Sequence, residues 1–202
     1  MKNKFITFEG IDGSGKSTQI QLLYDYLSKR SEKIILIREP GTTSIGEEIR
    51  KILMDKKNNA MSYKTEALLF MAARAQLVYE KIMPALENNI TVICDRFIDS
   101  SIVYQGIGRN LGENFIHQLN QTVTNGINPD ITFFLDIKPK DVMQRKIGLV
   151  ESDRLESENL DFHCKIYNAY KKLAVENNRR IKIIDANDNP MNIHQKIVSF
   201  LK

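Results

Sequence analysis

The sequence is poor in residues that hold metal ions or disulfides. It has two cysteines, Cys94 and Cys164, and three scattered histidines, and these form no spaced metal-binding pattern. Cys94 lies inside an apolar run, which favours a buried free thiol and a reducing cytosol. Nothing in these residue types predicts a structural metal or a disulfide scaffold.

Long apolar runs and basic clusters are also missing. No stretch approaches the ~18 apolar residues of a membrane-spanning helix, and the N-terminus has no signal-peptide core. The net charge of +4 is mild, and no run of lysine or arginine forms a stripe for nucleic acid. With 42% hydrophobic and 27% charged residues, we expect one globular, cytoplasmic domain over residues 1–202 that binds neither membrane nor nucleic acid.

Five short apolar runs, separated by helical patterns, indicate the fold class. Near-continuous apolar runs are typical of strands buried on both faces, so we expect an α/β fold with a five-stranded parallel sheet and helices on both faces, in three layers. The expected strands are 5–8, 34–37, 90–94, 131–135 and 181–184. The expected helices are about 16–30, 44–54, 62–88, 97–104, 112–124, 139–148, 157–177 and 190–201.

The first strand leads into a phosphate-binding pattern. Gly10, Gly15, Lys16 and Ser17 match G-x-x-x-x-G-K-[ST] in the strand–loop–helix setting that this motif requires. Backbone N–H groups of such a loop surround polyphosphate oxygens at the positive end of the helix dipole. Lys16 can then reach the β- and γ-phosphates, and the Ser17 hydroxyl can ligate Mg²⁺. The predicted nucleoside triphosphate site comprises Gly10, Ile11, Asp12, Gly13, Ser14, Gly15, Lys16, Ser17 and Thr18.

Ligands of open parallel sheets gather beyond the carboxyl ends of the strands. Glu39 follows the second strand, where a phosphate or substrate pocket competes with a plain turn as the interpretation. Asp95 ends the third strand as a candidate Mg²⁺ ligand, and Asp136 at the end of the fourth is the alternative. We favour Asp95, because the adjacent Arg96 would then face the phosphates.

Two helical patterns carry side chains suited to a nucleotide. Phe70 and Arg74 are one turn apart, where an aromatic ring can stack on a base and a guanidinium can donate to it. Ser101, Tyr104 and Gln105 also share a helical face and could hydrogen-bond a sugar and a base. A core phenylalanine and a merely polar helix surface are the alternatives.

The stretch 148–159, GLVESDRLESEN, is polar and has no periodicity. It lies near the expected phosphate end of the sheet, so we expect a mobile lid at about 143–160. The cations in this stretch and at the helix end before it are Arg145, Lys146 and Arg154.

The motifs FEGIDGSGKST, REPG, GEEIR, LLFMAARA, DRFIDSSIVYQG and SDRLE follow one another in this order. Together they resemble the thymidylate kinases of the bacterial type, from Phe8 to about Tyr170. The resemblance implies a P-loop NTPase fold and transfer of the γ-phosphoryl group of ATP to dTMP, giving dTDP and ADP in dTTP biosynthesis. It also implies Mg²⁺ as a cofactor and a homodimer.

The same resemblance implies a role for each matching residue. In the dTMP site, Phe70 would stack on thymine, Tyr104 would lie beside the sugar, and Asp12 would contact the 3′-hydroxyl. The other implied dTMP residues are Glu39, Arg50, Arg74, Arg96, Ser101 and Gln105. Lys16, Arg96 and the lid residue Arg154 would be catalytic, Arg145 would lie against adenine, and Ser17 and Asp95 would hold the metal.

Three alternatives remain at this stage. A kinase for another nucleotide or small molecule shares the P-loop. A regulatory GTPase is disfavoured because the chain lacks an N/T-K-x-D segment, the nearest match being 128–130. A nucleic-acid-stimulated ATPase would need a basic face interleaved with aromatic residues, which is not visible.

Overall fold

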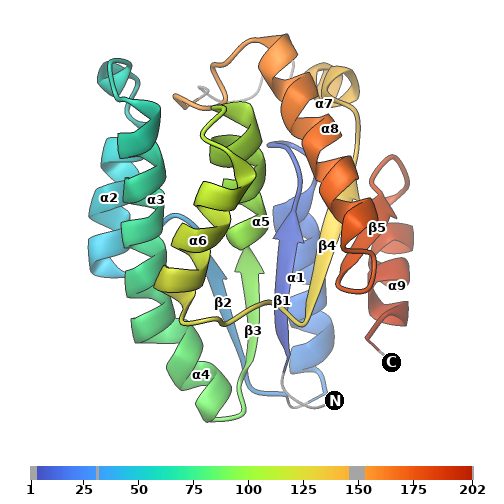
Figure 1. Ribbon diagram of the computed structural model, residues 1–202. Coiled ribbons are helices and arrows are strands. Elements are labelled where there is room, and N and C mark those ends of the chain that lie inside the picture. Colours follow the sequence, from blue (N-terminus) through green and yellow to red (C-terminus); the bar gives the residue numbers. More distant parts are fainter. Residues whose placement is uncertain (1–3, 31, 146–152, 202) are drawn as a thin grey trace.

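The computed structural model describes residues 4–30, 32–145 and 153–201. Its five strands form one parallel sheet in the order β2-β3-β1-β4-β5 (Figure 1). The strands are β1 (Phe5–Glu9), β2 (Ile34–Arg38), β3 (Thr91–Asp95), β4 (Ile131–Asp136) and β5 (Ile181–Asp185). The predicted parallel sheet is therefore confirmed, with each strand boundary within one residue of expectation.

Helices cover both faces of the sheet, because neighbouring residues of a strand point to opposite sides. In β4, the Phe133 ring lies 6.3 Å from Phe200, which follows α9 (Pro190–Ser199). The next residue, Phe134, stacks at 5.3 Å on Tyr170 of α8 (Leu160–Glu176). The remaining regular helices are α1 (Lys16–Ser28), α2 (Ser44–Met54), α3 (Tyr63–Leu77), α4 (Met83–Glu87), α5 (Ile98–Ser101), α6 (Glu113–Thr124) and α7 (Pro139–Arg145), with a 3₁₀ turn at η1 (Lys56–Asn58).

Two expected helices differ in winding. The segment predicted as one helix, 62–88, consists of α3, a π-helical segment η2 (Val78–Ile82) and α4. Pro84 lies in the first turn of α4 and has no backbone N–H to donate. The segment predicted as 97–104 is α5 followed by a second π-helical segment, η3 (Ile102–Gly108). Such windings occur frequently at functional sites. They were not predicted, because a hydrophobic pattern does not distinguish a π turn from an α turn.

The chain around the predicted lid is partly described. Helix α7 ends at Arg145, and 146–152 lie outside the described residues. Helix α8 begins at Leu160 rather than at 157, because the Asn159 side chain accepts from Phe162 N at 2.9 Å and caps the first turn. Among the described residues, no helix is long and apolar enough to cross a membrane.

Candidate active site

The P-loop joins β1 to α1 and folds its lysine inward. Gly15 precedes α1 with φ of 95°, a conformation that a side chain would strain. The Lys16 ammonium donates to the carbonyl oxygens of Gly10 and Ile11, both at 3.2 Å, and lies 3.8 Å from Asp12 Oδ1. Burial and the nearby Arg96 lower the pKa of Lys16. The ammonium charge of Lys16 therefore lies at the centre of the loop, where these contacts are 3.2 Å or longer.

The ends of three strands meet beside this loop. Asp95 of β3 lies in register with Phe8 of β1 and with Arg38 of β2. Glu39 N donates to the Asp95 carbonyl at 3.0 Å, and Arg96 N donates to the Phe8 carbonyl at 2.9 Å. The chain segments that follow β1, β2 and β3 are thereby brought to one edge of the sheet.

Arg96 is held in an unusual conformation over the P-loop. Its φ of 67° is left-handed, which is uncommon for a residue with a side chain and is often found at functional sites. Its guanidinium donates to Asp12 at 2.7 Å and to the hydroxyls of Ser100 and Tyr170, both at 3.2 Å. Burial acts against its charge, but Asp12, Tyr104, Tyr170 and Asp95 together outweigh burial and raise the pKa of Arg96. Arg96 is therefore a fixed cation.

The carboxyl group of Glu9, at the end of β1, organises the segment after β3. It accepts from the backbone N–H groups of Phe97 and Ser100, from the Ser100 hydroxyl at 2.6 Å and from the Tyr170 hydroxyl at 2.7 Å. Burial, and secondarily the charge of Asp99, raises the pKa of Glu9 to about 7. Because Ser100 and Tyr170 also accept from Arg96, Glu9 indirectly positions that cation.

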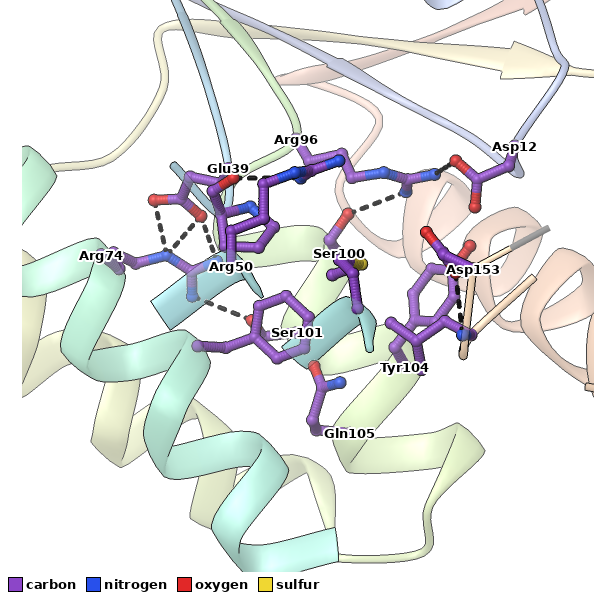
Figure 2. Close-up of a pocket in the computed structure, with 14 residues that line it drawn as sticks. Asp12, Glu39, Arg50, Arg74, Arg96, Ser100, Ser101, Tyr104, Gln105 and Asp153 are labelled. Atoms are coloured by element: carbon purple, nitrogen blue, oxygen red, sulfur yellow. Dashed lines mark hydrogen bonds and ion pairs between the residues drawn. The ribbon is translucent and has the colours of Figure 1, made fainter. Parts of the chain in front are cut away.

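A hollow of about 530 Å³, open to solvent, lies next to these groups (Figure 2). This pocket gathers residues from the P-loop, the β2–α2 connection and four helical segments. It is lined by Asp12, Glu39, Pro40, Arg50, Met54, Phe70, Arg74, Arg96, Ser100, Ser101, Tyr104, Gln105, Asp153 and Leu155. All nine residues predicted for the dTMP site are therefore brought together.

Arg74 is the most constrained of these residues. It is 1% exposed, and its guanidinium is paired with the buried carboxylate of Glu39. Its remaining N–H groups donate to Ser101 Oγ at 3.0 Å, to Asn120 Oδ1 and to the Phe97 carbonyl. An arginine has five N–H donors, and these hydrogen bonds together use all five. A contact with a base would have to share one of them.

Several pocket side chains keep polar atoms for a ligand. The Tyr104 hydroxyl is buried and has no hydrogen-bond partner among the described residues, and the Arg96 guanidinium lies 5.4 Å from its ring. Gln105 donates from its amide nitrogen to Glu66 at 2.9 Å. Phe70 is half-buried against the pocket. A buried hydroxyl without a partner is costly unless a ligand satisfies it.

Comparison with known proteins agrees with this geometry. The family model described as thymidylate kinase matches residues 8–197. A thymidylate kinase of Thermoanaerobacter sp. (strain X514) is 49% identical over 202 residues, covering 100% of this chain and 98% of the relative. One of Finegoldia magna is 46% identical, covering 98% and 97%. The crystal structure of thymidylate kinase from Ehrlichia chaffeensis superposes with a TM-score of 0.82 at 34% identity, covering both chains fully.

The chain belongs to the thymidylate kinase family. The family activity is ATP-dependent transfer of a phosphoryl group to dTMP, so the chain is a phosphotransferase of nucleotide biosynthesis. Its sheet and helices have the P-loop NTPase arrangement of that family.

Of the predicted lid cations, only Arg154 has a described side chain, and it makes its hydrogen bond and ion pair away from the P-loop. The Arg154 guanidinium donates to the Leu53 carbonyl at 2.8 Å and lies 2.7 Å from Glu66 Oε2, so its contacts are with α2 and α3. The side chain of Arg145 lies outside the described part of the structure. The predicted roles of both residues therefore stay predictions.

Sequence reasoning did not assign five of the residues that line the pocket: Pro40, Met54, Ser100, Asp153 and Leu155. It also missed residues that hold the predicted ones in place. Ser100 and Tyr170 accept from Arg96, Glu9 binds both of those hydroxyls, and Glu66 accepts from Gln105. Glu66 had a usable signal, because it lies one helical turn before Phe70 on the same face of α3. Tyr170 had none, since its helix is remote in sequence from the segment it contacts.

Proposed function

We propose that residues 1–202 form one P-loop kinase domain in which the ATP phosphates lie along Gly10 to Thr18 and dTMP occupies the neighbouring pocket. The observation that carries the proposal is the pocket itself. Residues predicted from separate motifs, among them Glu39, Phe70 and Gln105, line one hollow together with Asp12, which lies 3.8 Å from the P-loop lysine. Donor and acceptor phosphates would then meet at Arg96, which bonds Asp12 of the loop and also lines the pocket.

The nucleoside of dTMP fits the inner part of the pocket. The half-buried ring of Phe70 can stack on thymine, and the Gln105 amide can hydrogen-bond its edge. The Tyr104 hydroxyl, which has no hydrogen-bond partner among the described residues, can bind the deoxyribose. The Asp12 carboxylate also lines the pocket and would contact the sugar while it keeps its ion pair with Arg96. Arg74 would act mainly by fixing Ser101 and Glu39, sharing one donor with the base.

The acceptor phosphate would lie between Arg50 and Arg96, both of which line the pocket. Arg50 donates to the Pro40 carbonyl at 3.0 Å and so is fixed close to Glu39. Phosphoryl transfer proceeds through a transition state with charge spread over the equatorial oxygens, so alignment and neutralisation dominate catalysis. Lys16 and Arg96 supply that charge. The acceptor is already an anion, so no strong general base is required.

The donor set also suits Mg²⁺. Asp95 Oδ1 is buried without a hydrogen-bond partner among the described residues, and Ser17 is exposed in the first turn of α1. Mg²⁺ is commonly held by one or two carboxylates together with substrate phosphates and water. We infer that Ser17 and Asp95 hold the ion, which when bound neutralises charge on the transferring phosphates.

Arg154 can join the reacting phosphates only if it leaves its contacts with Glu66 and the Leu53 carbonyl. That movement is part of the proposal for Arg154 as a catalytic residue. Arg145, at the end of α7, is proposed to lie against adenine.

We further propose a cytoplasmic homodimer that binds neither nucleic acid nor membrane. Support for the dimer comes from large apolar side chains on neighbouring elements at one flank of the molecule, where α2 and α3 lie side by side (Figure 1). Ile45 and Ile52 of α2, Leu68 of α3 and Tyr79 of η2 are 46–70% exposed. Light scattering coupled to gel filtration measures the mass directly, and a single-chain mass of 23.3 kDa at micromolar concentration would contradict the dimer.

The acceptor assignment is tested with Mg-ATP and a panel of nucleoside monophosphates. Formation of ADP with dTMP, and weakly with dUMP, supports the proposal, whereas turnover without an acceptor indicates an ATPase.

The base site is tested with Phe70→Ala. Loss of a stack worth ~1–3 kcal/mol should raise the KM for dTMP on the order of 10-fold and leave the KM for ATP unchanged. Phe115→Ala, at a partly exposed phenylalanine of α6, is the matched control. Equal effects of Phe70→Ala on both nucleotides would assign Phe70 to the core instead.

A further inference from the structure

One end of the Gln105 amide is held by a buried carboxylate. Gln105 is 1% exposed, and its Nε2 donates to Glu66 Oε1 at 2.9 Å. Its side-chain oxygen accepts no hydrogen bond from the described residues, and the side chain lies in the pocket below Ser101 (Figure 2). The amide oxygen is therefore the atom left for a ligand.

Glu66 can only accept hydrogen bonds. It is 0% exposed, and besides Gln105 it receives Arg109 at 3.2 and 3.3 Å and Arg154 at 2.7 Å. Burial acts to raise its pKa, but the hydrogen bonds from Gln105, Arg109 and Arg154 and the charge of Arg109 together outweigh burial and lower the pKa of Glu66. A carboxylate kept ionised in this way has no proton to donate. Gln105 must therefore turn its nitrogen toward Glu66.

We propose that Glu66 is a positioning residue that sets base specificity by fixing the orientation of the Gln105 amide. With its oxygen in the pocket, Gln105 accepts the ring N3–H of thymine or uracil. Cytosine presents a lone pair at the same ring position, so two acceptors would face each other. This inference rests on the proposed placement of the base against Phe70 and Gln105.

The position of Glu66 fits this role. Glu66, Phe70 and Arg74 follow one another at four-residue spacing, so they lie on one face of α3. One helix face thus carries the group that orients the base-reading amide, the ring that stacks and the arginine that fixes Ser101. Because the Glu66 carboxylate is bound by Gln105, Arg109 and Arg154 at the same time, its orientation and that of the Gln105 amide are restricted.

The test is Glu66→Gln, assayed with dTMP and dCMP as acceptors. A glutamine at this position can offer N–H to the Gln105 oxygen, which allows the Gln105 amide to turn over. We expect the ratio of kcat/KM for dTMP over dCMP to fall by about 10-fold or more, through a higher KM for dTMP and a gain for dCMP, with the KM for ATP unchanged. Glu80→Gln is the matched control, since Glu80 is an exposed carboxylate that binds Gln76 and Lys81.

A double-variant cycle separates positioning from structure. In a Gln105→Ala background, Glu66→Gln should change the acceptor ratio by less than about 2-fold, because the amide it orients is gone. If loss of the Glu66 charge beside the buried Arg109 keeps the variant from folding, Glu66→Gln/Arg109→Gln is compared with Arg109→Gln alone.

An unchanged acceptor ratio in folded Glu66→Gln, or an equal fall in both backgrounds, overturns the inference. The proposed base site fails separately, if Gln105→Ala and Phe70→Ala both leave the KM for dTMP unchanged.

Discussion

Glu9 provides a prediction about stability that follows directly from its surroundings. Its side chain is buried, 1% exposed, and four donors converge on it, yet burial and Asp99 raise its pKa to about 7. Glu9→Gln preserves the shape and removes the titration. The substitution therefore isolates the free energy that this single ionisation contributes to folding.

The sign follows from proton binding. Below pH 4.5 the carboxyl is protonated in both states and contributes nothing. Between the unfolded value of 4.5 and the folded value of about 7, the native state keeps a proton that the unfolded state releases, so the stability of the wild type falls as pH rises. The shift from 4.5 to about 7 corresponds to about 3 kcal/mol, fully expressed above pH 7.

The assay is chemical denaturation of both proteins at several pH values from 4 to 8. The wild type should lose about 3 kcal/mol relative to Glu9→Gln across this range. Glu47→Gln is a control of opposite sign, because a hydrogen bond from Thr42 N and the pairing with Arg38 lower the pKa of Glu47. The difference in free energy of unfolding between the wild type and Glu47→Gln should depend on pH only below pH 4.5. Parallel stability curves for wild type and Glu9→Gln would refute the reasoning.

Three further predictions concern the P-loop, the sugar and the core. Lys16→Ala should lower kcat by at least ~10²-fold, because it removes a charge used mainly in the transition state, and near-normal turnover would overturn the P-loop assignment. Tyr104→Ala should improve the use of ribonucleotide acceptors relative to dTMP, and unchanged kcat/KM ratios would remove Tyr104 from the sugar pocket. Arg180→Ala should destabilise the fold by ~3–5 kcal/mol in denaturant titrations, because it removes the charged partner of a buried carboxylate. That carboxylate belongs to Asp99, which is 1% exposed and accepts two hydrogen bonds of 2.7 Å from Arg180. A loss of stability under ~1 kcal/mol would speak against a structural ion pair.

Motif spacing predicted the local parts of the site well. The P-loop needs only a strand, a glycine-rich turn and a helix in succession, and all three are where the pattern places them. Phe70 and Arg74 likewise share a face because of helical geometry alone, and both line the pocket. Short-range backbone geometry controls such features, so a single sequence suffices to predict them.

Partners remote in the chain were not predictable. Whether Arg74 is a free donor or a saturated one depends on Glu39, Asn120 and Phe97, which come from three other segments. The ion pair of Arg154 with Glu66 and the hydrogen bond from Tyr170 to Glu9 likewise join segments that are remote in the sequence. No periodicity reports these pairings, because they depend on how the helices pack over the sheet.

The sequence by itself determined the parallel sheet, the strand–loop–helix of the P-loop motif and nine of the side chains that line the pocket, because periodicity and turn chemistry act over a few residues. Only the tertiary structure decided which polar atoms remain available to a ligand, since burial and the choice of partner depend on contacts between remote segments, such as that of Glu9 with Tyr170, 161 positions apart.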